Sequence, residues 1–116
     1  MTDCLFCKIV SGDVDADVVM RTPGTVAFKD INPAAPVHVL VVPRRHIENA
    51  AFVEPEHAPE VAELLTSARA VAEMEGIASE ERGYRLVFNV GPDALNSVPH
   101  LHLHVIGGRK MTWPPG

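Results

Sequence analysis

Histidine and apolar residues alternate through residues 100–106, which read His-Leu-His-Leu-His-Val-Ile. Successive side chains of an extended strand point to opposite faces, so this segment is expected to be a strand with His100, His102 and His104 on one face. Neighbouring imidazolium groups repel one another, which disfavours a merely solvated histidine surface. Histidine serves as a nucleophile, a general acid or base, or a metal ligand. The run therefore predicts a strand with an apolar face and a chemically active face.

The rest of the chain predicts four more strands and two helices. Runs of β-branched and aromatic residues indicate strands at 18–21, 25–29, 38–43 and 85–90, in addition to the histidine strand at 100–106. Apolar residues at helical spacing indicate a short helix at 4–10 and a longer one at 59–75. Strands and helices do not alternate regularly, so we expect an α+β fold: a five-stranded antiparallel sheet with one main helix and a short N-terminal helix.

Length and charge limit the functional classes. The 116 residues, 47% of them hydrophobic, are expected to form one domain spanning 1–116 with its own core. A net charge of −5 with ten scattered basic residues argues against a nucleic-acid partner and favours a small polar ligand. No stretch approaches the roughly 20 apolar residues of a membrane span, so we expect a cytoplasmic protein without a membrane partner.

The two cysteines form a Cys4-Leu5-Phe6-Cys7 motif. In a reducing compartment such a pair is a metal half-site or a redox pair more often than a structural disulfide. A thioredoxin-type motif would follow a strand, whereas this one precedes every predicted strand, so zinc is favoured. Two small buried side chains on a short helix remain the alternative.

Several motifs together resemble the histidine triad superfamily, and in particular its nucleotide-binding branch. Besides the histidine run, the resemblance rests on 28–33 (FKDINP), 36–43 (PVHVLVVP), 89–91 (NVG), 96–98 (NSV) and the tail from Gly107 to Gly116. These motifs cover nearly the whole chain. The resemblance implies a HIT-like fold, a homodimer whose sheets join edge to edge, and hydrolysis of adenosine 5′-phosphoramidates or acyl and aminoacyl adenylates to AMP.

The same resemblance assigns the catalytic residues. His102 would attack the α-phosphorus to give a covalent nucleotidyl-histidine, and His104 would donate to a phosphate oxygen. His38 would orient the nucleophile, and His100 completes the triad. Ser97 would hydrogen-bond the leaving nitrogen, and Asn89 would contact the phosphate or ester oxygen.

The substrate-binding residues are implied in the same way. Backbone amides of Asn96, Ser97 and Val98 would bind phosphate oxygens, and Asp30 would accept the ribose hydroxyls. Phe28 and Ile31 would form apolar walls for the base.

Cys4, Cys7, His46 and His100 offer two thiolates and two imidazoles, a set that suits tetrahedral zinc. The resemblance implies that this metal, if bound, is structural and that catalysis requires no cofactor. His46 follows Cys7 by 39 positions, which exceeds any zinc-finger spacing.

The chain also departs from the family pattern. Ala94 and Leu95 stand where a glycine-richer loop is typical, and Pro99 stands where an aromatic residue is commoner. Two other functions stay open: a nucleotide-binding or interaction module with incidental hydrolysis, and a dinucleoside polyphosphate hydrolase. Comparing turnover of phosphoramidates and diadenosine polyphosphates would separate them.

Overall fold

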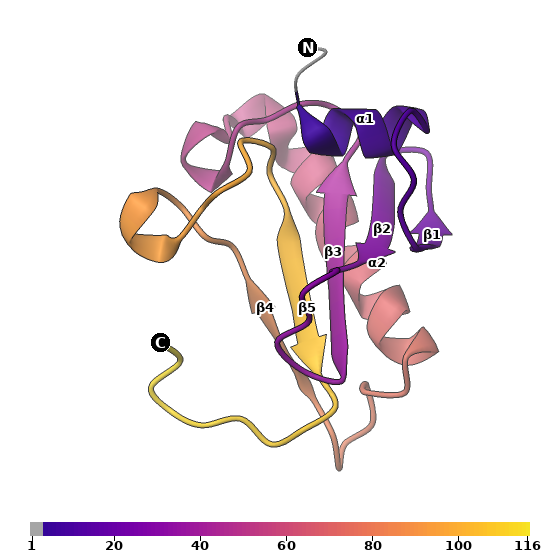
Figure 1. The fold of residues 1–116 in the computed structure, drawn as a ribbon, viewed down its shortest axis with the longest axis vertical. Coiled ribbons are helices and arrows are strands. Elements are labelled where there is room, and N and C mark those ends of the chain that lie inside the picture. The colour runs from indigo at the N-terminus through magenta and orange to yellow at the C-terminus, as the bar shows by residue number, and fades with distance from the viewer. Residues whose placement is uncertain (1–3) are drawn as a thin grey trace.

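Five antiparallel strands form one sheet with a helix on each face in the computed structural model, which describes residues 4–116 (Figure 1). The strands are β1 (Val18–Arg21), β2 (Thr25–Lys29), β3 (Val37–Pro43), β4 (Tyr84–Val87) and β5 (Leu103–Gly107), in the order β1-β2-β3-β5-β4. The helices are α1 (Leu5–Ser11) and α2 (Ala58–Met74), with 3₁₀ turns at Ala50–Phe52, Pro55–His57 and Pro92–Ala94. The expected α+β class, strand number and two helices are confirmed.

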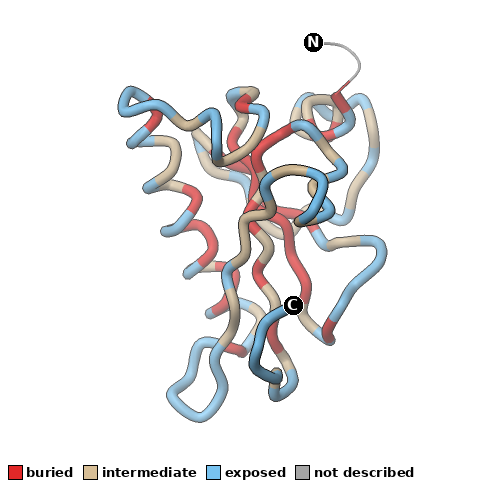
Figure 2. The backbone as a smooth tube through the Cα atoms, turned by 90° about the vertical axis from the view of Figure 1, so that its left-hand side faces the viewer, coloured by how far each residue is buried: buried red, intermediate tan, exposed pale blue. Residues whose placement is uncertain are grey.

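The two faces of the sheet bury different residues. Val39, Val41, Leu103 and Val105 pack with α2 in one buried cluster. Val26, Phe28, Leu40 and Val42 lie on the other face with α1. Buried positions accordingly follow the central strands and one side of α2, while the C-terminal tail is exposed (Figure 2). The alternation along β3 and β5 thus separates an apolar face from the face that carries the histidines.

The histidine strand begins later than the sequence predicts. β5 pairs with β3 from Val37↔Gly107 to Val41↔Leu103, so the next two pairs would be Val42 with His102 and Pro43 with Leu101. Proline has no backbone N–H, and this ladder cannot continue through it. The amide of Leu101 instead donates to the carbonyl of Ile47 at 2.6 Å. His100 and His102 therefore lie just before the strand, although Leu101 and Leu103 keep their inward orientation, at 2% and 1% exposure.

The edge strand β4 is shorter than expected. It ends at Val87, opposite His104, and residues 88–90 continue without strand pairing. None of the helices within residues 4–116 is both long enough and apolar enough to cross a membrane.

A carboxylate joins the β1–β2 turn to α2. Glu63 accepts hydrogen bonds from the Thr22 hydroxyl at 2.5 Å and from the amide of Gly24 at 2.9 Å. These two bonds lower the pKa of the Glu63 carboxyl. A Cβ atom at position 24 would overlap Glu63 Oε1, so a side chain there would push the carboxylate away from these bonds. The hairpin that leads into the Asp30 loop is thereby fixed to the main helix.

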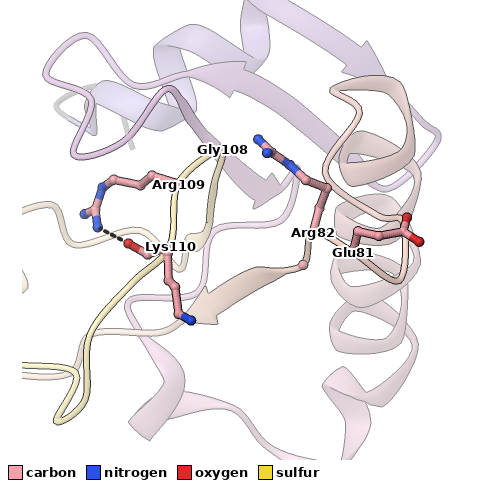
Figure 3. A pocket seen from close by; sticks show the side chains of 6 residues that line it. Glu81, Arg82, Gly108, Arg109 and Lys110 are labelled. Carbon is pink, nitrogen blue, oxygen red and sulfur yellow. Dashed lines mark hydrogen bonds between the residues drawn. The ribbon is translucent and has the colours of Figure 1, made fainter.

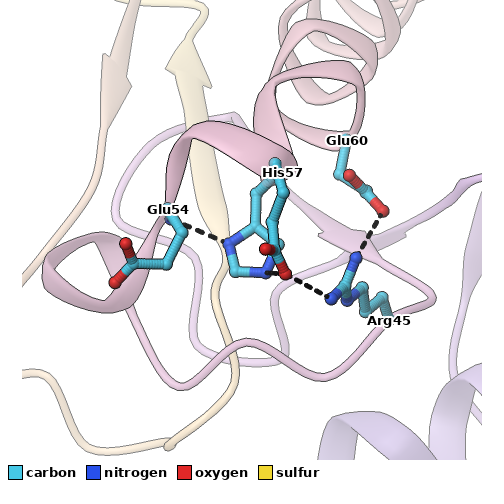
Figure 4. A network of polar contacts seen from close by, with 5 residues as sticks. Arg45, Glu54, His57 and Glu60 are labelled. Atoms are coloured by element: carbon cyan, nitrogen blue, oxygen red, sulfur yellow. Dashed lines mark hydrogen bonds and ion pairs between the residues drawn. The ribbon is translucent and has the colours of Figure 1, made fainter.

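The start of α2 is held by a second polar network (Figure 4). The ring of His57 is buried, and its Nδ1 accepts from the amide of Glu54 at 2.9 Å. Arg45 reaches both Glu56 and Glu60 at 3.3 Å. The Glu54–His57 contact caps the 3₁₀ turn that precedes α2, and the Arg45 contacts tie this turn and the first turn of α2 to the segment after β3.

Candidate active site and metal centre

The orientation of the His102 ring is set by the main chain. Its Nδ1 lies 2.7 Å from the carbonyl oxygen of His100. A carbonyl only accepts, so Nδ1 carries the proton and donates it. The neutral ring then keeps its lone pair on Nε2. This is the form of histidine that acts as a nucleophile.

His38 and His104 form a directed hydrogen-bond chain. The amide of Ala34 donates to His38 Nδ1 at 2.9 Å, so the proton of the neutral His38 ring is on Nε2. That nitrogen lies 2.9 Å from His104 Nδ1 and 3.4 Å from Asp30 Oδ2. Because His104 Nδ1 accepts, its proton is on Nε2. The chain therefore places the N–H donor of His104 on Nε2.

His104 stays neutral near pH 7. Burial, followed by the nearby charges of His102 and His38, lowers its pKa to about 4, and Asp30 opposes the shift. The rings of His102 and His104 are 5.0 Å apart. The side-chain amide of Asn89 lies 3.4 Å from His104 Nε2, and because that nitrogen carries the proton, the amide oxygen is the atom that accepts there. A lone pair on one ring thus stands beside an N–H donor on the next, an arrangement suited to attack on an electrophile that carries anionic oxygens.

Asp30, His38 and His104 could also be read as metal ligands, since their ligand atoms lie within 4.8 Å of one another. A metal would need a lone pair on His38 Nε2. The Ala34 amide already occupies the lone pair on Nδ1 and so places the proton on Nε2. The group is therefore better described as a hydrogen-bond chain.

The other predicted binding residues have fewer contacts with one another than the histidines do. Phe28 is buried at 4% exposure, whereas Ile31 is 91% exposed. Ser97 is exposed, and no side-chain hydrogen bond joins it to the rest of residues 4–116. Asn96 donates to the carbonyl of Val98 at 3.3 Å. Val98 packs against the cluster under α1.

Phe6 is a site neighbour that the sequence did not reveal. Its ring meets His102 edge-on at 5.1 Å and Phe28 at 5.3 Å. An isolated phenylalanine in a short helix has no signal beyond core packing. Only its place between the two cysteines could have drawn attention to it.

The four predicted zinc ligands come together. The Nδ1 atoms of His46 and His100 lie 3.3 Å apart, and Cys7 Sγ lies 3.3 Å from the first and 3.4 Å from the second. Cys4 Sγ is 3.3 Å from His100 Nδ1. Tetrahedral Zn²⁺ with Zn–N bonds of about 2.0–2.1 Å separates two nitrogen ligands by about 3.3 Å.

The protonation of His100 also fits a metal. Its Nε2 lies 2.9 Å from the carbonyl of Pro43 and therefore donates, which leaves the lone pair on Nδ1 facing the cluster. Burial lowers the pKa of His100, so the ring stays neutral. The donor set and its geometry thus fit a structural zinc ion with no open position for a substrate.

A separate hollow of about 350 Å³ lies between the α2–β4 connection and the segment after β5 (Figure 3). It is lined by Glu81, Arg82, Gly83, Gly108, Arg109 and Lys110. None of these residues belongs to the histidine site, so the hollow is not the predicted nucleotide site.

The model of the HIT domain family matches residues 11–111, and the chain belongs to this family. It is 40% identical to the 14 kDa zinc-binding protein of Brassica juncea over 116 residues, 98% of this chain and 100% of the relative. It is 41% identical to the protein named Adenylylsulfatase HINT1 of Arabidopsis thaliana over 114 residues, 97% of this chain and 76% of the relative.

A solved structure shares the fold closely. The crystal structure of a HIT family hydrolase from Legionella pneumophila Philadelphia 1 superposes with a TM-score of 0.93 at 46% identity, covering 98% of this chain and 100% of that one. The resemblance that the sequence motifs indicate is confirmed at the level of family and fold.

Proposed function

We propose that the protein is a hydrolase that cleaves purine nucleoside 5′-phosphoramidates, or acyl and aminoacyl adenylates, to AMP through a covalent intermediate on His102. The main support is the bond from His102 Nδ1 to the His100 carbonyl, which leaves the Nε2 lone pair free. Membership of the HIT family and the likeness to a HIT family hydrolase support the same conclusion.

The first step forms one bond and breaks one. His102 Nε2 attacks the α-phosphorus, the phosphorus–nitrogen bond breaks, and the amine leaves with a proton that solvent supplies through the Ser97 hydroxyl, which hydrogen-bonds the leaving nitrogen. The ring becomes an imidazolium, which the His100 carbonyl stabilises through Nδ1–H. His104 Nε2–H donates to a phosphate oxygen as negative charge develops there.

Water completes the reaction. It attacks the phosphorus of the nucleotidyl-histidine, the bond to His102 breaks, and AMP is released. The water that attacks in this second step returns a proton to solvent. In this proposal Asn89 and the amides of 96–98 contact the phosphate, Asp30 binds the ribose, and Phe28 and Ile31 flank the base.

Zinc would be held by Cys4, Cys7, His46 and His100, and its role would be structural. A relative named for zinc binding supports this assignment. Metal analysis of the purified protein should find one zinc per chain, and a chain without zinc would contradict the assignment.

We also propose a homodimer formed through β4. This strand pairs only with β5 in the described sheet, so its outer edge has free backbone groups, and Leu86 on it is 41% exposed. Light scattering should give twice the chain mass, and Leu86→Asp should shift the protein toward the monomer. A monomeric natural protein would rule this out.

The test of the reaction is mass spectrometry of the intact protein after brief mixing with an adenosine 5′-phosphoramidate. We expect an AMP adduct on the natural protein and none on His102→Asn, with AMP binding retained. His57→Asn is the matched control, because it changes a buried histidine outside the site and an asparagine oxygen can still accept from Glu54. Persistent hydrolysis by His102→Asn would exclude the mechanism.

Adenosine 5′-phosphosulfate should be compared in the same assay, because one relative is named an adenylylsulfatase. A sulfate leaving group needs no proton, whereas an amine does. Faster turnover of the sulfate ester would identify it as the better substrate. Binding of AMP without turnover of either compound would favour a nucleotide-binding module.

A further inference from the structure

His100 belongs to both candidate centres. Its ring faces the cysteines and His46 through Nδ1, and its main-chain carbonyl accepts from His102 Nδ1 at 2.7 Å. The residue is completely buried. One residue therefore connects the ligand cluster to the nucleophile, with no side chain between them.

The carbonyl of His100 is not held by the sheet. β5 begins only at Leu103, because Pro43 cannot continue the ladder. The peptide group between His100 and Leu101 instead makes two other bonds: its N–H donates to the Ile47 carbonyl at 2.6 Å, and its C=O accepts from His102.

Both ends of that peptide group are attached to residues of the ligand cluster or to their direct neighbours. Ile47 directly follows His46, and the carbonyl itself belongs to His100. The cluster thus holds the peptide group from both sides. A change in the position of either ligand would move the acceptor that determines which nitrogen of His102 carries the proton.

The Cys4–Cys7 segment adds a third contact. Phe6, between the two cysteines, packs edge-on against the rings of His102 at 5.1 Å and His100 at 6.0 Å. Its ring is buried at 5% exposure. The segment that supplies the thiolates therefore also limits the rotation of the nucleophile.

We propose that Cys4, Cys7 and His46 are positioning residues for His102, acting through the His100–Leu101 peptide group and through Phe6. The inference rests on the proposed roles of His102 as the nucleophile and of the cluster as a zinc site. It predicts that loss of zinc disturbs the tautomer of His102 and the rate of the chemical step, while nucleotide affinity is unchanged.

The experiment compares the zinc-loaded natural protein with the same protein after chelation. Long-range ¹⁵N–¹H spectra of the imidazoles, with the His102 signals assigned by His102→Asn, report the tautomer directly. We expect a single Nδ1–H tautomer with zinc and a mixture without it. We expect kcat to fall about tenfold, as for other residues that orient ligands or reacting groups, with the Kd for AMP unchanged and the rate restored by added zinc.

His46→Asn is the second variant, because it removes one ligand and keeps Cys4, Cys7 and His100. It replaces the chelated protein in the comparison if that protein does not stay folded. Phe6→Leu is a matched variant that leaves all four ligands in place. It should keep zinc and lose only part of the kcat.

The same Nδ1–H tautomer with and without zinc, or an unchanged kcat after zinc loss, would overturn the inference. The tautomer measurement needs no substrate. A zinc-loaded protein that keeps His102 in one tautomer but forms neither an AMP adduct nor AMP from the phosphoramidate would therefore refute the proposed function separately from the coupling.

Discussion

Two groups of side chains, each with histidines and acidic or thiol partners, lie on the same face of the sheet and are suited to different chemistry. In the group of Cys4, Cys7, His46 and His100, ring lone pairs point at a common centre because the far nitrogen of His100 donates to a carbonyl. In the group of Asp30, His38 and His104, the Ala34 amide takes the lone pair of His38 and turns the group into a proton-ordered chain. Residue type alone does not separate a metal centre from a catalytic one; the main-chain partner of the second ring nitrogen does.

The largest expected effect is on the first group. Replacing Cys4 and Cys7 together by serine should abolish zinc binding and lower the free energy of unfolding by about 4 kcal/mol, the linkage term for a ligand at a thousand times its Kd. Metal analysis and denaturant unfolding measure both. His38→Ala should leave zinc at one per chain, and loss of zinc in that variant would show that the two groups are not distinct.

The second group is tested through its terminal donor. His104→Phe removes the N–H that faces the proposed phosphate and should lower kcat by about 10²–10³-fold, the usual cost of one such donor. Steady-state kinetics on the phosphoramidate measure the loss. Zinc content should not change. A change in KM alone would mean that His104 only binds substrate.

The groups should also differ in their response to acid. The pKa of His104 is lowered to about 4, so between pH 6.5 and 4 the unfolded chain binds more protons than the folded one. Stability is then complete above pH 6.5 and falls toward pH 4, by about 1–2 kcal/mol after allowance for partial solvent exposure. Denaturant titrations at several pH values, compared with His104→Gln, isolate this term, because acid release of zinc affects both proteins. Parallel curves would contradict it.

The smallest effect concerns the loop that leads to both groups. Leu95 has φ 60° and ψ 37°, in the left-handed region, and is 84% exposed. Leu95→Gly should relieve that backbone and raise the free energy of unfolding by up to about 1 kcal/mol. Thermal unfolding measures this, with Ala94→Gly as the matched control, for which no gain is expected. An unchanged or lowered Tm for Leu95→Gly would show that the conformation is not strained.

The hydrophobic pattern of the sequence was sufficient to predict the fold. It was not sufficient for features that depend on hydrogen bonds to the main chain. The strands at 18–21 and 25–29 match the structure residue for residue, because their β-branched runs are bounded by turn formers. The predicted start of the histidine strand at residue 100 was wrong, because the sequence does not show that Leu101 would face Pro43. The ligand set and the histidine neighbours were predicted through family likeness. Their protonation could not be predicted, because it depends on the Ala34 amide and the His100 carbonyl.

The contact between Cys4 and His100 also bears on the order in which the chain folds. It joins residues 96 apart, so it spans most of the chain. Closing so long a loop is slow and gains little until the intervening sheet has formed. During synthesis the thiols emerge first and must wait for the last strand. We therefore expect the metal cluster to form late and to complete the folded state instead of nucleating it.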